Sequence, residues 1–331
     1  MSLFKPESLG LDDLPQALAL LSPGDCGIDS ASALKLWKQW HAMDALSIGW
    51  VRAMGEPTTH AVKTLGVTLW ITDHAAASIR HGGVGSAAQQ LYRACSADPA
   101  SPAWVMDKAQ ILKAHKAQKL NLLVLHFWTR MLPTDDEFLP IFVITTRQFQ
   151  ELHQGFGIQQ ALQEVASFEL PFVDPMGLSA ISRAGQVPDL HQPPELQRVL
   201  VGVDRSELTS KKSGAVALLL VSPPSRLMLR ETAQRILGLA LKEHTDEEIA
   251  AILGCRRDSL RPVWDSIYAA LENASVNLLT SELREKDASA NISGQSPALT
   301  LAAAPVRGRE RRRLALAFFR HNLQELRPGF R

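Results

Sequence analysis

The chain has 331 residues, which is enough for about two domains and at least one sizeable hydrophobic core. Hydrophobic residues make up 46% of it and charged residues 21%, a composition typical of globular proteins and not of disordered ones. The formal net charge is +1, so no global electrostatic field draws the chain to nucleic acid or to a membrane surface.

Hydrophobic periodicity predicts two helices first, at residues 12–21 and 30–43. Strands and helices then alternate along the chain. The predicted strands lie at 45–54, 60–73, 120–128, 198–204 and 215–224, and the predicted helices at 85–98 and 145–168, the second interrupted at Gly155 and Gly157. This alternation predicts an α/β or α+β domain over residues 1–224, for which ligand sensing is one candidate role.

The β pattern stops at Leu227, and helical patterns follow at 230–243, 245–254 and 258–274. They predict a small all-α domain over residues 225–278. A linker rich in Ser, Ala, Gly and Pro is expected at 279–306. The last segment, 307–331, is predicted to be a basic amphipathic helix, which must dock on its own chain or on a second subunit because an isolated helix of this length is marginal in water.

The three helical patterns have the signals of a helix-turn-helix. Thr245 and Glu248 form a capping box at the start of the first helix of the motif, and Gly254 is placed to end it. Leu260 and Ile267 recur at helical spacing in the second, which we expect to start near Asp258, because a proline at 262 is tolerated only in the first turn.

A set of residues in this region matches a known pattern in unbroken register: Leu227, Arg230, Glu231, Thr245, Glu248, Ile249, Ala250, Leu253, Ser259, Leu260, Arg261, Ile267 and Leu271. It resembles the LuxR-type (GerE-type) helix-turn-helix of bacterial transcriptional regulators. The runs GVTLWITD, LNLLVLHFW and GFGIQQALQEV are similar to those of a group of such regulators with a poorly characterised N-terminal domain.

The resemblance implies a transcriptional regulator and not an enzyme. Its recognition helix is expected to enter the major groove of double-stranded DNA. The predicted DNA-binding residues are Thr245, Arg256, Arg257, Ser259 and Arg261. A homodimer is expected as well, and RNA polymerase is a further candidate partner. The arginines of the last segment are expected either to add phosphate contacts or to belong to a structural clasp.

A second motif lies in the N-terminal half, in the run RHGGVGSAAQQL at 80–91. Its residues Arg80, Gly83, Gly85 and Ser86 resemble the pyrophosphate-binding loop of GNAT-type acetyltransferases, in which backbone amides at a helix start hold phosphates. The alternative to the regulator is therefore a GNAT-like acyltransferase that uses acetyl-CoA and retains a vestigial helix-turn-helix. A simple loop before a helix explains the same residues, and no other cofactor is expected.

No other catalytic or metal-binding pattern is visible in the sequence. The histidines have no ligand spacing, and His126 and His153 are expected to be core or interface residues. Cys26, Cys95 and Cys255 are far apart and predict free thiols in a reducing compartment. With no secretory pattern at the start and no apolar run long enough to span a bilayer, the expectation is a cytoplasmic protein without membrane contact.

Overall fold

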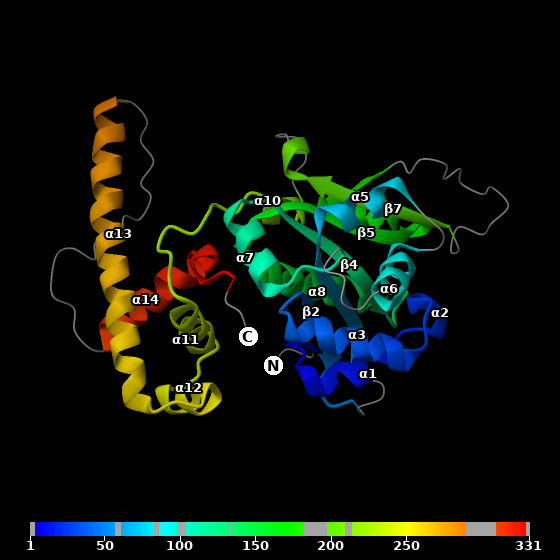
Figure 1. Ribbon diagram of the computed structural model, residues 1–331, viewed down its shortest axis with the longest axis horizontal. Helices are drawn as coiled ribbons and strands as arrows, with labels where there is room; N and C mark the ends of the chain where they lie inside the picture. Colours follow the sequence, from blue (N-terminus) through cyan, green and yellow to red (C-terminus); the bar gives the residue numbers. More distant parts are fainter. Residues whose placement is uncertain are drawn as a thin grey trace. The chain divides into compact units, whose positions relative to one another are not determined.

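The computed structural model describes residues 4–56, 61–82, 86–97, 104–132, 134–181, 197–208, 214–288 and 309–328. The chain divides into two compact units, Met1–Ser222 and Pro223–Arg331 (Figure 1). Within the described ranges, no helix combines the length and the hydropathy that crossing a membrane requires.

The N-terminal unit is built on a seven-stranded sheet with the strand order β1-β2-β3-β4-β5-β7-β6. The strands are β1 (Phe4–Ser8), β2 (Leu46–Ala53), β3 (Val62–Ile71), β4 (Leu120–Thr129), β5 (Ile158–Ala166), β6 (Ser179–Ala180) and β7 (Arg198–Asp204). Neighbouring strands are antiparallel except β4 and β5, which run parallel. Parallel strands need a crossover, and helix α8 (Phe138–His153) supplies it.

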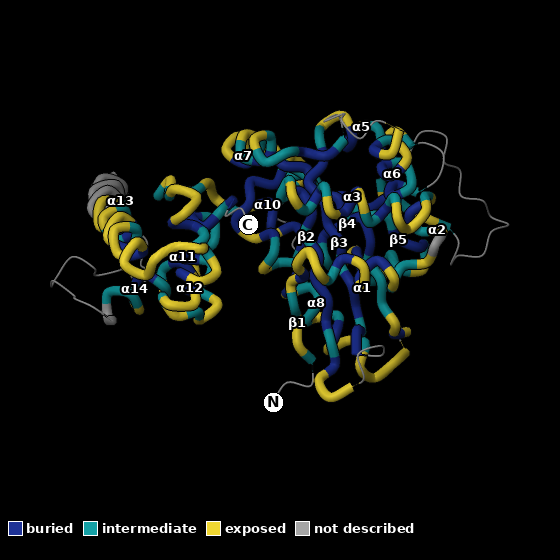
Figure 2. Tube along the Cα trace, turned by 60° about the horizontal axis from the view of Figure 1, so that its bottom comes forward, coloured by how far each residue is buried: buried dark blue, intermediate teal, exposed yellow. Residues whose placement is uncertain are grey.

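Helices cover both faces of this sheet, and Figure 2 shows the central strands buried between them. On one face, α8 packs across β1, β2 and β3. Helix α3 (Ser30–Ala42) contacts β2 and helix α6 (Ala87–Ala97) contacts β4 on the other. The remaining helical segments are η1 (Leu11–Asp13), α1 (Leu14–Leu18), α2 (Pro23–Cys26), α5 (Asp73–His81), α7 (Lys108–Lys116), η2 (Ser167–Glu169), α9 (Leu170–Val173), η3 (Asp174–Met176), η4 (Arg205–Glu207) and α10 (Ala217–Leu220).

Successive side chains of β3 point to opposite faces of the sheet, so the strand contacts the helices on both faces. Thr64 and Thr68 point to α8, where their hydroxyls lie 2.8 Å from Thr145 Oγ1 and 2.9 Å from His153 Nε2. Leu65, Val67 and Leu69 alternate with them, and all three are fully buried. Helix α8 also comes close to β2 at Gly49, where an added Cβ would lie only 2.7 Å from the Gln148 side chain.

The predicted α/β domain is confirmed, with two wrong assignments inside it. Residues 158–166 form strand β5 and not the end of a helix, because the chain turns at Gly155, whose φ is +89°, and then pairs with β4 and β7. The apolar run at 215–221 contains helix α10 and no strand. A short apolar run of this kind does not distinguish a buried strand from a buried helix.

The described part of the C-terminal unit is helical. Its elements are α11 (Glu231–Leu241), α12 (Asp246–Leu253), η5 (Arg257–Ser259), α13 (Leu260–Ala288), α14 (Arg309–His321) and η6 (Leu323–Leu326). One hydrophobic core joins them, with Ile236, Ile249, Ile267 and Phe319 fully buried. Helix α13 continues to Ala288, into the segment predicted to be a linker, and residues 289–308 lie outside the described ranges.

Helix α13 begins at Leu260, so Pro262 falls in its first turn, as the late start predicted. A first-turn amide has no partner within its helix, so the missing N–H of proline costs little there. We therefore expect Pro262→Ala to change the free energy of unfolding by less than about 1 kcal/mol, well below the ~3 kcal/mol of a mid-helix proline. Denaturant unfolding of the two proteins measures this, and a gain near 3 kcal/mol on substitution would contradict it.

Candidate functional site

The most unusual feature of the sheet is a gap between the parallel strands β4 and β5. They pair from Leu120 opposite Ile158 to Val124 opposite Gln163, and no further. Beyond that point β4 stays paired with β3, and β5 stays paired with β7. The two facing edges therefore carry backbone N–H and C=O groups that do not pair across the gap.

A β-bulge lies where the strands separate. His126 is opposite Val67 and Val124 is opposite Thr68, which leaves Leu125 as an extra residue without a partner on β3. A bulge bends its strand and increases the local twist. It therefore accounts for the turning of β4 away from β5, and it aims the backbone of Leu125 away from the regular ladder.

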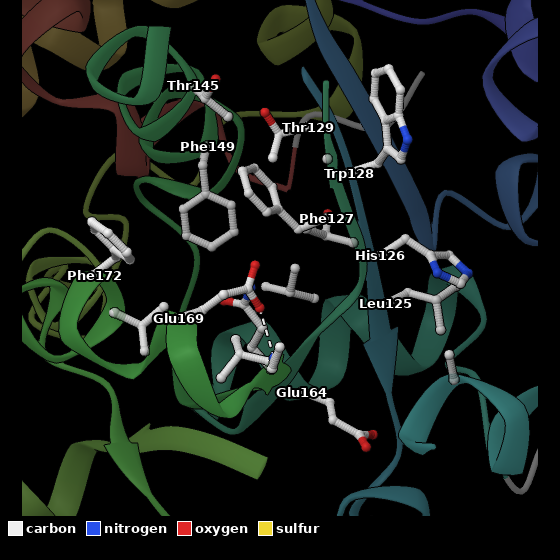
Figure 3. Close-up of a pocket in the computed structure, with 18 of the residues that line it drawn as sticks. Leu125, His126, Phe127, Trp128, Thr129, Thr145, Phe149, Glu164, Glu169 and Phe172 are labelled. Carbon is white, nitrogen blue, oxygen red and sulfur yellow. Dashed lines mark hydrogen bonds between the residues drawn. The ribbon is translucent and has the colours of Figure 1, made fainter. Parts of the chain in front are cut away.

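A cavity of about 700 Å³ occupies the gap and reaches both faces of the sheet. Its walls include Val124–Thr129 of β4 and Ala161–Ala166 of β5. Figure 3 shows that the side chains of β4 alternate around it, with Phe127 on the side of Phe149 and His126 on the opposite side. The cavity therefore has two chemically different sides.

The side that faces α8 is aromatic, and we call it the aromatic chamber. Its phenylalanines are Phe127, Phe138, Phe142, Phe149, Phe168 and Phe172. The ring centroids of Phe138 and Phe142 lie 5.7 Å apart, and those of Phe138 and Phe172 lie 5.6 Å apart. Helix α8 presents Phe138, Phe142 and Phe149 to the chamber because these positions fall on one helical face.

Polar groups at the chamber are mostly engaged within the protein. The Thr145 hydroxyl donates to the Ile141 carbonyl oxygen at 2.9 Å and contacts Thr64. His153 bonds the Thr68 hydroxyl through Nε2 and lies 2.7 Å from the Phe149 carbonyl oxygen through Nδ1. The half-buried Glu169 accepts the Ala166 backbone N–H at 2.7 Å, as Figure 3 shows.

The side that faces α6 holds a chain of buried polar groups. The Trp37 Nε1–H donates to the Tyr92 hydroxyl oxygen at 2.7 Å, and that hydroxyl lies 2.9 Å from His126 Nε2. The hydroxyl also contacts the Cys26 thiol, so the single Tyr92 proton has two acceptors beside it, the imidazole nitrogen and the Cys26 sulfur. Burial lowers the pKa of His126 to about 3, so this imidazole is neutral at neutral pH.

Glu164 lies on the same side, on β5 at the end of the paired region. Its carboxylate accepts the backbone N–H of Ala87, the first residue of α6. A carboxylate at a helix N-terminus is favoured by the helix dipole. The start of α6 is thus already bonded to an internal anion.

This contact bears on the predicted phosphate loop. Arg80 lies in α5 and its Nε donates to the Gln160 side chain at 2.9 Å. Ser86 precedes α6, and its hydroxyl accepts the Gln89 N–H at 3.2 Å. Gly83 and Gly85 lie outside the described residues. The loop therefore meets the cavity through Ser86, whereas Arg80 is committed to β5.

Sequence reasoning missed most of the groups around the gap. Glu164 was assigned to a helix, which hid its place at a strand edge. Phe138, Phe142 and Phe149 did carry a signal, since their spacing places them on one face of a helix. The separation of β4 from β5 has no local signal, because it depends on pairings between distant segments.

The five residues predicted to bind DNA lie in the C-terminal unit, and all five are exposed. Arg257 forms a 3.0 Å ion pair with Glu247. Thr245 caps α12, with its hydroxyl accepting the Glu248 N–H and Glu248 accepting the Thr245 N–H. Arg256, Ser259 and Arg261 are exposed.

Two arginines of α14 lie over aromatic rings of α13. Arg312 lies 4.6 Å from the Trp264 ring centroid and 2.8 Å from the Asp246 carboxylate. Arg311 lies 4.4 Å from the Tyr268 ring centroid and pairs with Glu272. Acidic side chains of the same unit therefore pair with both arginines. The tail docks on its own chain, where Ala315, Phe319 and Leu326 are buried in the core of the C-terminal unit.

No family model matches the chain, and no curated protein is similar to it. Spermidine N-acetyltransferase from Vibrio cholerae, solved with CoA and spermine, is similar over 62% of this chain and 98% of its own, at 11% identity and a TM-score of 0.30. FeeM, an N-acyl amino acid synthase from uncultured soil microbes, is similar over 62% of this chain and 91% of its own, at 10% identity and a TM-score of 0.32. The C-terminal condensation domain of Ebony, solved with beta-alanyl-dopamine, is similar over 62% of this chain and 100% of its own, at 10% identity and a TM-score of 0.34.

These comparisons overturn the predicted identity. The similar structures are named as acetyltransferases, an acyl amino acid synthase and a condensation domain, and none of these three as a DNA-binding regulator. These findings correct the prediction of a LuxR-type regulator with DNA and RNA polymerase as partners, and the prediction that the chain is not an enzyme. The prediction of no cofactor also lacks support, since one of these enzymes holds CoA.

Proposed function

We propose that the N-terminal unit transfers an acyl group from a thioester to an amine, with the gap between β4 and β5 as the active site. The observation that carries the proposal is the pair of unpaired strand edges that flank the cavity beside the bulge at Leu125. An extended ligand with amide groups can add to such edges as a further strand does. The pantetheine arm that bears acyl thioesters has this chemistry.

The fit to coenzyme A is good for the thioester arm and poor for the phosphates. The start of α6 is bonded to Glu164. The start of α8 carries three exposed carboxylates, Asp135, Asp136 and Glu137, which would repel a diphosphate. Among the described residues, the starts of α6 and α8 thus offer no phosphate cradle. We therefore assign the thioester arm to the gap and assign no residue to the nucleotide.

Glu164 and His126 have complementary chemistry on the α6 side. In the proposed reaction the amine nitrogen attacks the thioester carbonyl carbon, the C–S bond breaks and the sulfur leaves as a thiol. Glu164 is the base that takes the proton from the amine and then returns it to the leaving sulfur, which completes the thiol. His126, held through Nε2 by Tyr92, has Nδ1–H to donate to the carbonyl oxygen as negative charge develops there.

The test is thiol release from acyl thioesters in the presence of a panel of primary amines, with the full chain. Glu164→Gln is expected to lower kcat about 100-fold, because the amide keeps the acceptor for Ala87 N–H but removes the base. The matched control is Glu151→Gln on the exposed face of α8, which should leave kcat unchanged. Absence of amine-dependent thiol release with every thioester and amine would overturn the proposal, and so would equal effects of the two substitutions.

A further inference from the structure

We infer that the acyl group is a long apolar chain and that the aromatic chamber holds it. The inference rests on the proposed function for the thioester, but its evidence is the chamber itself. Six phenylalanines line one side of a cavity of about 700 Å³, of which an acetyl group would fill only a small part. A volume of this size is in the range of ~300–1,000 Å³ that holds a drug-sized ligand.

The chamber has little to offer a polar ligand. The hydroxyl of Thr145, both ring nitrogens of His153 and the side-chain amide of Gln148 are bonded to other protein groups. A polar ligand would lose its bonds to water there without regaining them. An apolar chain loses none and gains the burial of its surface. Glu169 is the acidic group at this side, so a neutral acyl chain fits better than a free fatty acid.

The outer end of the chamber is also apolar. Leu132 and Phe168 line the cavity, yet they are 66% and 45% exposed. Large apolar side chains gathered at a cavity mouth mark a binding site for apolar ligands. A chain too long for the chamber would continue along these residues.

A larger side chain at Gly66 of β3 would shorten the aromatic chamber from the side of the sheet. It lies opposite Phe127 in the β3–β4 ladder and lines the cavity. A Cβ added there would meet only the Gly49 carbonyl oxygen, at 3.9 Å, so the start of a side chain is accommodated. Gly66→Leu therefore projects its branched end into the space that an acyl chain would occupy. Phe142→Ala does the opposite and enlarges the chamber.

The experiment measures binding of N-acetylcysteamine thioesters to the full chain by titration calorimetry. The acyl series is acetyl, butanoyl, octanoyl and dodecanoyl, all uncharged. The affinity is expected to rise about fourfold for each added methylene that is buried. Gly66→Leu should weaken dodecanoyl binding about tenfold or more while changing acetyl binding little. Phe142→Ala should move the preferred chain to a greater length.

The matched control is Gly238→Leu in α11, at a position with no atom within 4 Å of an added Cβ, and it should leave all affinities unchanged. Affinity that does not depend on chain length would overturn the inference, as would unchanged dodecanoyl binding in a folded Gly66→Leu protein. Equal turnover of acetyl and dodecanoyl thioesters would overturn it too, while the proposed function stood. Length-dependent binding without transfer to any amine would leave the chamber assignment intact and overturn the proposed function.

Discussion

Replacing Glu325 with alanine is expected to lower the free energy of unfolding of the C-terminal unit by about 3–5 kcal/mol. Glu325 is only 2% exposed, and its carboxylate accepts hydrogen bonds from the first residues of the unit. It accepts the Ser225 hydroxyl at 2.9 Å, the Arg226 N–H at 3.0 Å and the Leu227 N–H at 2.8 Å. Alanine leaves these donors without an acceptor in a site that water reaches poorly.

Hydrogen exchange of the α11 and α12 amides, read by mass spectrometry, reports this unit separately from the N-terminal one. Glu325→Gln keeps an acceptor oxygen and the shape of the side chain, so its loss should be smaller. Glu247→Ala is the exposed control: it removes an ion pair whose side chains are 66% and 61% exposed, worth at most about 1 kcal/mol. Equal losses for Glu325→Ala and Glu247→Ala would contradict the assigned role.

The stability of the N-terminal unit is expected to fall by about 2 kcal/mol between pH 7 and pH 5 through His126 alone. The cause is the difference between its ordinary pKa of 6.5 and its pKa of about 3 in the folded chain. Below pH 6.5 the His126 imidazole takes up a proton in the unfolded chain but stays neutral in the folded one. Stability is therefore lost as the pH falls, until the folded ring protonates near pH 3.

The comparison that isolates this effect is His126→Gln, which cannot titrate but still offers an acceptor to the Tyr92 hydroxyl. Denaturant unfolding of both proteins at several pH values gives two stability curves, and their difference removes the shared contribution of the carboxylates. The free energy of unfolding of the unsubstituted protein should fall more steeply below pH 6.5 than that of His126→Gln. Parallel curves would show that His126 titrates near its ordinary value and is not held neutral by burial.

The strands at the centre of the sheet could be predicted because their signals are local. In β3 small or polar side chains alternate with Leu65, Val67 and Leu69, and β4 is an almost continuous apolar run. Strand β5 was hidden because its run QQALQEV is composed of good helix formers. Pairing with β4 on one side and β7 on the other outweighs that preference.

The candidate site was harder to predict than the fold. The gap exists because β4 bulges at Leu125 while β5 follows β7, and neither event is written in a short window of sequence. The helix-turn-helix pattern shows the opposite case. Its helices are present, but the same capping box and arginine positions serve internal contacts such as Arg257 with Glu247. A local pattern of this kind specifies geometry and leaves the partner open.

The bond between Glu325 and Ser225 joins residues 100 positions apart in the chain. Phe319, at the centre of the same core, also comes from the last segment. During synthesis, helices α11 to α13 therefore emerge from the ribosome before the residues that complete their core. The ribosome adds about 5–20 residues per second, so this unfinished surface is exposed for several seconds. Among the described residues, the last strand of the sheet is β7, which is complete once Asp204 has been added. The N-terminal unit can therefore fold while translation continues, whereas the core of the C-terminal unit is complete only after Leu326 has been added.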